Sequence, residues 1–372
     1  MPTKRKFLIL VSLTTIYLLL ARYVFWPAAN LVPQLDGLTN FIKISLAKEL
    51  QVVPRLGPIS NNTDAKPDIK LLNPKDIHVF KGEILILVTS HIKLHKRRES
   101  IRASWGNQTR FVNYSRKYNN ASYKVYFITG FLENDFHEAQ IESTIYHDLL
   151  ITNRTEDYRD LSRRFMLGFL WALEHCTFNY VMKTDDDVFV NVPKLFKLLY
   201  TDPFVLEHKD RLYAGKIYPT TGPIRDTKSK WHVTKEEWAL DYYPPFATGM
   251  CIILSRLILE RIRPLFDWIN PFRLEDVYIG MLVNRANIAQ IGIRVDVYEM
   301  DQFYNFHMKG ECQYMRQAIT YHKVDGPSCM EQLTTLSIHN PRHYFYFVVY
   351  VFVFIAYNFT FVYIFRRNLK SR

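Results

Sequence analysis

The chain is 372 residues long, 48% hydrophobic and 15% aromatic, and its 48 basic and 36 acidic residues give a formal net charge of +12. That charge does not indicate nucleic-acid binding, because the basic residues gather at the two chain ends and at residues 95–98, without an aromatic-interleaved basic groove. A phosphotransferase of the P-loop type is excluded by the lack of a glycine-rich loop followed by Lys-Ser/Thr.

The N-terminal end has the pattern of a membrane anchor. Three basic residues at 4–6 precede an apolar run, so the positive-inside rule predicts a cytosolic tail at 1–6 and a signal-anchor transmembrane helix at 7–26, with the following residues in the lumen. A cleaved signal peptide is the alternative, because Pro27, Ala28 and Ala29 offer a weak cleavage site. Luminal residence is favoured by the glycosylation sequons at Asn61, Asn107, Asn113, Asn120 and Asn153.

Residues 27–80 are rich in proline and poor in strong apolar runs, which is typical of a stem that holds a domain away from a membrane. A folded domain is expected at 81–340. It begins with the continuous apolar run 83–90, a pattern of a strand buried on both faces.

Strands and helices then alternate. Helical spacing at 96–105 places Arg98 and Arg102 on one face, and a second strand follows at 123–129. The stretch 157–176 is an amphipathic helix, and a strand at 180–183 comes directly after it. This alternation predicts an α/β fold with a mostly parallel central sheet and flanking helices.

Three consecutive aspartates, Asp185, Asp186 and Asp187, end that strand, and a further apolar strand segment follows them. Like charges at neighbouring positions repel unless a cation or hydrogen-bond donors compensate them. Carboxylates at this density suit Mg²⁺ or Mn²⁺, which typically bridge a carboxylate to substrate phosphates. A solvated acidic turn is the alternative. The apolar flanks favour a metal–phosphate site at the edge of a buried sheet.

Two constellations lie downstream. An aromatic–proline turn at 242–249 leads into a buried strand at 250–254, and Gly249 would let a ligand approach the backbone, although a bulge explains it equally well. The acidic pair Glu275 and Asp276 opens an apolar segment, where acidic residues are ordinary partners of a helix dipole.

The C-terminal end carries a second apolar segment, 344–365, followed by a basic tail at 366–372. Its length and basic flank predict a second membrane span, which would leave both termini in the cytosol. Asn358 and Thr360 weaken this prediction, and the aromatic and β-branched content would also suit a buried strand or an interfacial segment.

Several ordered motifs resemble the β-1,3-glycosyltransferase family that contains β-1,3-galactosyltransferases and β-1,3-N-acetylglucosaminyltransferases, known as glycosyltransferase family 31. The resemblance spans about residues 83–330 and is carried by the segments RRESIRASWG (97–106), YFITG (126–130), YVMKTDDDVFVN (180–191), YYPPFATG (242–249) and EDVYIG (275–280).

The resemblance implies a Golgi type II membrane protein with a GT-A fold that uses Mn²⁺ and a UDP-sugar and inverts the anomeric carbon. It further implies that Asp187 coordinates the metal, that Asp185 and Asp186 contact the ribose or support the ion, and that Asp276 is the general base. An inverting displacement needs one carboxylate to take the proton of the acceptor hydroxyl. Arg98 and Arg102 are candidates to hold the nucleotide, and an ion pair is their alternative role.

The segment 318–322 resembles a family segment that carries a histidine, which makes His322 a second protein ligand of the metal, with His307 as a competing candidate. The expected function is transfer of galactose, GlcNAc or GalNAc from a UDP-sugar to the glycan of a glycoprotein or glycolipid. The alternative is a non-catalytic luminal chaperone or glycan-binding protein with the same fold.

Cys176, Cys251, Cys312 and Cys329 allow one or two disulfides, and their pairing stays open. No CxxC or Cys/His spacing indicates zinc. The family often has a cysteine directly after its ProPro-aromatic unit, where this chain has Ala247, so a pairing cannot be transferred from the resemblance.

Overall fold

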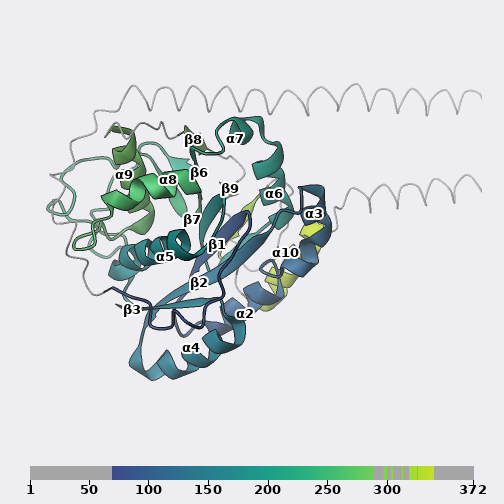
Figure 1. Cartoon of the computed structure of the whole chain (residues 1–372). Coiled ribbons are helices and arrows are strands. Elements are labelled where there is room, and N and C mark those ends of the chain that lie inside the picture. Colours follow the sequence, from purple (N-terminus) through teal and green to yellow (C-terminus); the bar gives the residue numbers. More distant parts are fainter. Residues whose placement is uncertain are drawn as a thin grey trace, which may run out of the picture. The chain divides into compact units, whose positions relative to one another are not determined.

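A computed structural model describes residues 69–288, 296–299, 303–304, 312, 318–324 and 326–338 (Figure 1). The apolar segments 7–26 and 344–365, both terminal tails, most of the predicted stem and His307 lie outside these residues. Within the described part of the chain, no helix is long and apolar enough to cross a membrane.

The strands are β1 Ile84–Thr89, β2 Tyr123–Phe131, β3 Leu149–Thr155, β4 Tyr180–Asp185, β5 Val188–Val190, β6 Leu212–Tyr218, β7 Phe246–Ser255, β8 Asp296–Glu299, β9 Phe303–Tyr304 and β10 Thr320–His322. The α-helices are α2 His95–Ala103, α3 Val112–Lys117, α4 Glu133–Tyr146, α5 Leu161–His175, α6 Val192–Thr201, α7 Pro203–Glu207, α8 Arg256–Ile262, α9 Glu275–Ile288 and α10 Pro327–Ile338. Short 3-10 turns are η1 Gln108–Phe111, η2 Tyr158–Asp160 and η3 Arg263–Leu265.

The central sheet has the strand order β3-β2-β1-β4-β7-β6-β8. Strands β3, β2, β1 and β4 run parallel, as the alternation of strands and helices predicts. Strand β7 is antiparallel to both β4 and β6, so the sheet is mixed. Because β7 runs against β4, its first half lies at the carboxyl edge of the parallel strands. Strands β6 and β8 are parallel as well, so the expectation of a mostly parallel sheet is confirmed, with β7 as an antiparallel strand within it.

Helices cover both faces of the sheet (Figure 1). Side chains of β1 alternate between the faces: Ile84, Ile86 and Val88 join a buried cluster with residues of α2, α6 and α10. On the other face α5 lies against the sheet beside α8 and α9 (Figure 1). Gly168 lets α5 approach closely, because a Cβ there would meet the Cδ1 of Ile128 at 2.8 Å. Each β1 side chain is thus buried, which explains the continuous apolar run in the sequence.

A second sheet, with the order β5-β10-β9, continues directly from the three aspartates. Strand β10 pairs antiparallel with β5, so that His322 lies opposite Val188. The N–H of Val324 donates to the carbonyl of Asp187 at 2.8 Å, which fixes the end of β10 beside the aspartates. This pairing brings residues about 135 positions apart to one edge, and no local sequence pattern encodes it.

The folded domain begins before residue 81. Leu72 donates its N–H to the carbonyl of Ile151 at 2.8 Å. The side chain of Asn73 is buried and donates to the hydroxyl of Ser143 at 2.6 Å and to the carbonyl of Leu149 at 2.7 Å. Residues 69–80, which the sequence assigns to the end of the stem, therefore pack along the edge strand β3.

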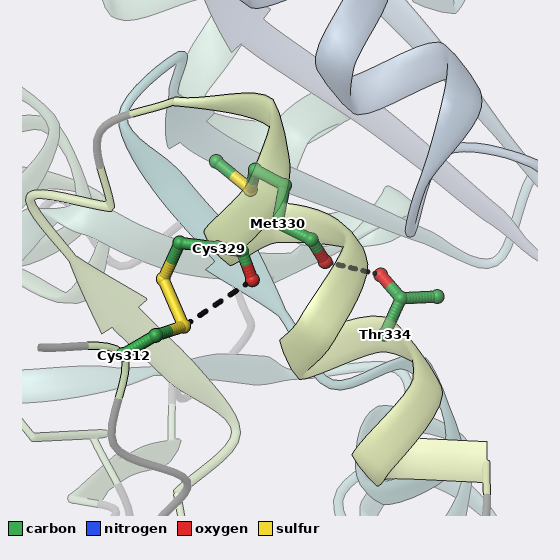
Figure 2. Close-up of a disulfide and its surroundings, with 4 residues drawn as sticks. All are labelled: Cys312, Cys329, Met330 and Thr334. Atoms are coloured by element: carbon green, nitrogen blue, oxygen red, sulfur yellow. Dashed lines mark hydrogen bonds between the residues drawn. A yellow bond between two sulfur atoms is a disulfide. The ribbon is translucent and has the colours of Figure 1, made fainter.

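One disulfide joins Cys312 to Cys329 at the start of α10, with 5.6 Å between the Cα atoms (Figure 2). Figure 2 also shows the hydroxyl of Thr334 donating to the carbonyl of Met330, at 2.8 Å, one turn further along α10. The other two cysteines, Cys176 and Cys251, are buried and unpaired. One of the pairings that the sequence leaves open is thus formed.

Candidate active site

The three aspartates lie where the parallel strands end. In the sheet Asp185 is in register with Thr89, the last residue of β1. The N–H of Asp186 donates to the carbonyl of Thr89 at 3.1 Å, so the chain leaves the sheet at this point and turns into β5. Ligands of open α/β sheets bind outside the carboxyl ends of the strands, which makes this edge the candidate active site.

Asp186 is held by donors on its own side of the edge. Its carboxylate accepts from the guanidinium of Arg97 at 2.9 Å and from the hydroxyl of Ser90 at 2.8 Å. Burial raises the pKa of Asp186, and the nearby charge of Asp187 raises it further, while Ser90 and Arg97 act in the opposite direction. The side chain is thus fixed in one orientation by α2 and by the residue after β1.

Arg98 and Arg102 lie in ion pairs rather than at the open edge. Arg98 is completely buried and makes a bidentate contact with Glu142 of α4, at 2.8 and 2.6 Å. Arg102 makes a bidentate contact with Asp148, at 2.9 and 2.6 Å. The ion-pair alternative therefore describes both arginines. Arg98 still reaches the site indirectly, because it donates to the hydroxyl of Ser90, which donates to Asp186.

Asp187 faces the second sheet. The Nε2 of His322 lies 3.6 Å from the Oδ2 of Asp187, and each side chain is about one quarter exposed. Two such ligand atoms at this separation can bind one divalent cation. A carboxylate together with an imidazole suits Mn²⁺ better than Mg²⁺.

Within the described residues, no group of three or more His, Cys, Asp or Glu side chains is placed to hold a metal ion. Asp185, the third predicted ligand, makes an ion pair with Lys183 instead. Asp187 and His322 nevertheless fit the mode in which Mn²⁺ or Mg²⁺ is bound by one or two protein ligands, with substrate phosphates and water completing the coordination.

A buried lysine joins the aspartates to the start of α9. The ammonium of Lys183 lies 2.8 Å from Asp185, 2.9 Å from Glu275 and 2.9 Å from the carbonyl of Gly249. It also lies 5.2 Å from the ring centroid of Phe165 on α5. Burial disfavours the charged ammonium, but the two carboxylates outweigh this effect and raise the pKa of Lys183. The lysine is therefore a fixed positive charge inside the site.

Asp276 lies in the first turn of α9, next to this network. Its Oδ2 accepts from the N–H of Gly249 at 3.3 Å, and its Oδ1 accepts from the N–H of Val277 at 2.8 Å. Burial, reinforced by the charge of Glu275, raises the pKa of Asp276 to about 7, while Lys183 and the two N–H groups act against this rise. A carboxylate with a pKa near neutrality can accept a proton at physiological pH.

Gly249 contacts Lys183, Glu275 and Asp276. A Cβ at this position would lie 2.8 Å from the Oε1 of Glu275 and 3.0 Å from the Nζ of Lys183. Its carbonyl accepts from Lys183, and its N–H donates to Asp276. Protein side chains therefore approach Gly249 closely, and the approach of a ligand to this glycine stays a prediction.

Sequence reasoning missed Lys183, Glu275 and Arg97 as site residues. Lys183 did carry a signal, because it is a charged residue within an otherwise apolar strand. Such a residue is buried only when it is paired, so a partner carboxylate was to be expected. Glu275 gave no distinguishing signal, since an acidic pair at a helix start is common.

The chain is similar to several known proteins. A family model described as Galactosyltransferase matches residues 96–294. UDP-GalNAc:beta-1,3-N-acetylgalactosaminyltransferase 1 of Homo sapiens is 26% identical over 246 residues, which cover 64% of this chain and 70% of that protein. Beta-1,3-galactosyltransferase 1 of Mus musculus is 28% identical over 246 residues, which cover 65% of this chain and 70% of that protein.

Among solved structures, a glycosyltransferase involved in the glycosylation of the major capsid of PBCV-1 aligns with a TM-score of 0.32 and 14% identity, covering 68% of this chain and 99% of that chain. This structural likeness is too weak to support an argument about the fold or the site.

Proposed function

Because the chain belongs to the galactosyltransferase family, we propose that it is an inverting, metal-dependent β-1,3-glycosyltransferase with a GT-A fold. The donor is a UDP-sugar that carries galactose, GlcNAc or GalNAc, and the acceptor is a hydroxyl on the glycan of a glycoprotein or glycolipid. The β-1,3 linkage rests on the activities named for the relatives, which include a beta-1,3-galactosyltransferase and a beta-1,3-N-acetylgalactosaminyltransferase.

The observation that carries this proposal is the position and protonation of Asp276. It is a half-buried carboxylate whose pKa is raised to about 7, and it contacts Gly249, which also accepts from Lys183 beside Asp185. A transferase that inverts in one step needs one base near the acceptor and positive charge near the departing diphosphate. Asp276 would provide the base, and a cation at Asp187 and His322 would provide the positive charge.

In the proposed reaction the acceptor hydroxyl gives its proton to a carboxylate oxygen of Asp276. The acceptor oxygen forms a bond to C1 of the donor sugar as the bond between C1 and the diphosphate oxygen breaks. The electron pair of that broken bond leaves on the UDP. Asp187 and His322 would hold a divalent cation, which would supply positive charge to the diphosphate, so that no second acid would be required.

The remaining site residues position these groups. Asp186, fixed by Ser90 and Arg97, faces the part of the edge where a nucleoside can bind, and its carboxylate suits ribose hydroxyls. Arg98 and Arg102 stabilise α2 against α4 and thereby hold Arg97 and Ser90 in place. We therefore assign the two arginines a supporting role and not a nucleotide contact.

The proposal places the domain in the Golgi lumen, as a type II membrane protein anchored by residues 7–26, with 344–365 as a second span. Disulfides persist in oxidising compartments, so the bond between Cys312 and Cys329 supports this location. Asn113 and Asn120, both in sequons, are exposed and therefore accessible to glycosylation.

The test is a donor screen of the full-length chain in detergent, in which UDP release is measured for each UDP-sugar with simple β-linked acceptors in Mn²⁺ or EDTA. Turnover with one donor, lost in EDTA, is expected. Tight binding of UDP and Mn²⁺ without turnover by any donor would instead favour the alternative, a non-catalytic luminal protein with this fold.

A further inference from the structure

Two exposed aromatic residues lie in segments connected to the residues just before α9. Tyr158 is 39% exposed and lies in η2, and Trp231 is 45% exposed and donates its backbone N–H to the hydroxyl of Ser229 at 3.1 Å. Exposed aromatic rings in ordered segments next to a reactive carboxylate are typical of ligand-binding surfaces, where a flat apolar face and a polar edge are both offered.

The two rings are close to each other. The ammonium of Lys230 lies 4.5 Å from the ring centroid of Trp231 and 5.8 Å from that of Tyr158, so it contacts both. The indole N–H of Trp231 also acts to lower the pKa of the Tyr158 phenol, against the effect of burial. Tyr158, Trp231 and Lys230 therefore form one surface, which we call the aromatic platform.

The platform is also close to the base. Burial raises the pKa of the Tyr158 phenol, and the charges of Glu275 and Asp276 raise it further. The packing of the chain supports this proximity, because η2, which contains Tyr158, leads directly into α5. The hydroxyl of Ser162, four residues after Tyr158, donates to the carbonyl of Phe272 at 2.6 Å, which joins the start of α5 to the segment just before α9.

The loop that carries Trp231 is preorganised. It spans residues 219–245, between β6 and β7, and is long for a connection within a compact domain, where such loops are usually functional. The guanidinium of Arg225 fills its centre and donates to four loop carbonyls, those of Val233, Thr234, Trp238 and Leu240, at 2.8, 2.6, 2.6 and 3.2 Å.

The same loop is anchored next to the base. Arg273 donates to Glu237 at 3.1 Å, and the ring of Trp238 contacts that of Phe272 at 6.0 Å. Phe272 and Arg273 lie just before α9, which begins with Glu275 and Asp276. The position of Trp231 relative to Asp276 is therefore fixed by packing on both sides of the loop.

We propose that the aromatic platform of Tyr158, Trp231 and Lys230 is the subsite for the acceptor, and that it stacks the apolar face of the acceptor sugar ring while Asp276 faces the hydroxyl that reacts. This inference rests on the proposed transferase function. The acceptor is a better occupant than the donor sugar, because Asp187 and His322 belong to the second sheet, whose strands pack into the α2/α6/α10 layer. Tyr158 directly precedes α5, and the loop of Trp231 is joined to Phe272 and Arg273 just before α9, so the platform belongs to the other helical layer.

This arrangement matches the geometry of inversion. The acceptor oxygen must approach C1 from the face opposite the departing diphosphate. With the diphosphate at Asp187 and the acceptor on the platform, C1 of the donor sugar would lie between the acceptor oxygen and the leaving oxygen, and Asp276 would take the proton of the acceptor oxygen. A sugar ring stacked on the platform would present its edge hydroxyls to Asp276, and the Lys230 ammonium can donate to its oxygen atoms.

The first test measures binding without turnover. Saturation-transfer NMR is recorded with the full-length chain, UDP and Mg²⁺, and with p-nitrophenyl β-galactoside or p-nitrophenyl β-N-acetylglucosaminide as the acceptor probe. Saturation of the sugar-ring protons of at least one probe is expected with wild type and is expected to be lost in Trp231→Ala. Equal saturation in both proteins, or none with either probe in wild type, would overturn the proposal.

The second test separates the acceptor from the donor in steady-state kinetics. Trp231→Ala is expected to raise the KM for the acceptor about tenfold, the effect of losing one aromatic contact. Trp231→Phe, which keeps a ring, should recover most of this loss, and it preserves the test if the alanine variant folds poorly. The donor KM and the slow release of UDP without acceptor should stay within about twofold of wild type.

A matched control is available. Tyr146 of α4 has the same exposure as Tyr158, 39%, but its ring lies against Arg102 at the opposite side of the domain from α9. Tyr158→Phe is expected to raise the acceptor KM, and Tyr146→Phe to leave it unchanged. A parallel rise of donor and acceptor KM in Trp231→Ala would overturn the acceptor assignment. Failure of wild type to use any UDP-sugar would contradict the proposed function and not the platform, which the binding test judges by itself.

Discussion

The buried ammonium of Lys183 pairs with both Asp185 and Glu275, so removing its charge should have a large effect on stability. In Lys183→Met the apolar stem of the side chain is retained and its charge is lost. Glu275, whose side chain is 7% exposed, then has no counter-charge, and Asp185, which is 32% exposed, is partly compensated by water. Breaking a buried ion pair in this way costs about 3–5 kcal/mol.

For a domain of this size each kcal/mol lowers the melting temperature by about 2–4 °C, so Lys183→Met should melt about 6–20 °C below wild type. The measurement is thermal unfolding of the full-length protein, followed by tryptophan fluorescence. The matched control is Lys235→Met, because Lys235 is 61% exposed in its 3.2 Å ion pair with Asp241, and such surface pairs contribute about 1 kcal/mol or less.

The double variant Lys183→Met/Glu275→Gln adds a check on the cause. It should regain part of the lost stability, because the buried carboxylate that lacked a partner is also removed. Equal melting temperatures for Lys183→Met and Lys235→Met would refute the reasoning, since they would mean that the buried ammonium contributes no more than an exposed one.

Further predictions concern the metal, the arginine cluster and the base. Asp187→Ala should abolish the Mn²⁺ dependence of UDP binding in calorimetry, and an unchanged dependence would place the metal elsewhere. Glu142→Gln should lower the free energy of unfolding by about 3–5 kcal/mol, because it leaves the buried charge of Arg98 without its partner. The control is Glu260→Gln, at an exposed pair with Arg256, which should cost about 1 kcal/mol or less. Since Asp276 must be ionised to accept a proton and its pKa is raised to about 7, kcat/KM should fall as the pH drops below that value, and a flat profile between pH 5 and pH 8 in rate measurements with saturating metal would contradict this assignment.

The elements of the fold were predictable from local patterns. The apolar run at 83–90, the helical spacing at 96–105 and the amphipathic stretch 157–176 correspond to β1, to α2 and to η2 with α5. Each of these signals lies within a few turns of chain, where the burial of one face determines the periodicity. The direction of β7 was not predictable in this way, because it depends on the path of the 219–245 loop.

The site was predictable in its acidic residues and not in their partners. The aspartate triplet is visible because three neighbouring carboxylates have no role in folding. The partner of Lys183 lies 92 residues further along the chain, and Glu275 and Asp276 are adjacent acidic residues with different environments. Glu275 pairs with Lys183, whereas Asp276 accepts backbone hydrogen bonds from Gly249 and Val277 and has a raised pKa.

The arginines illustrate the same limit. Arg97, Arg98 and Arg102 have equal formal charge and lie within one helix. Their contacts in the fold differ: Arg97 pairs with Asp186, whereas Arg98 pairs with Glu142 and Arg102 with Asp148. A sequence pattern shows that two of them share a helix face, but it does not show what that face contacts.

The most direct test of the proposed function is Asp276→Asn. Asparagine keeps the size of the side chain and removes its ability to take a proton. The measurement is sugar transfer by the full-length variant alongside calorimetric binding of UDP with Mn²⁺. Loss of transfer with UDP binding within about twofold of wild type is predicted. Transfer at the wild-type rate, or loss of transfer together with loss of UDP binding, would contradict the assignment of Asp276 as the base.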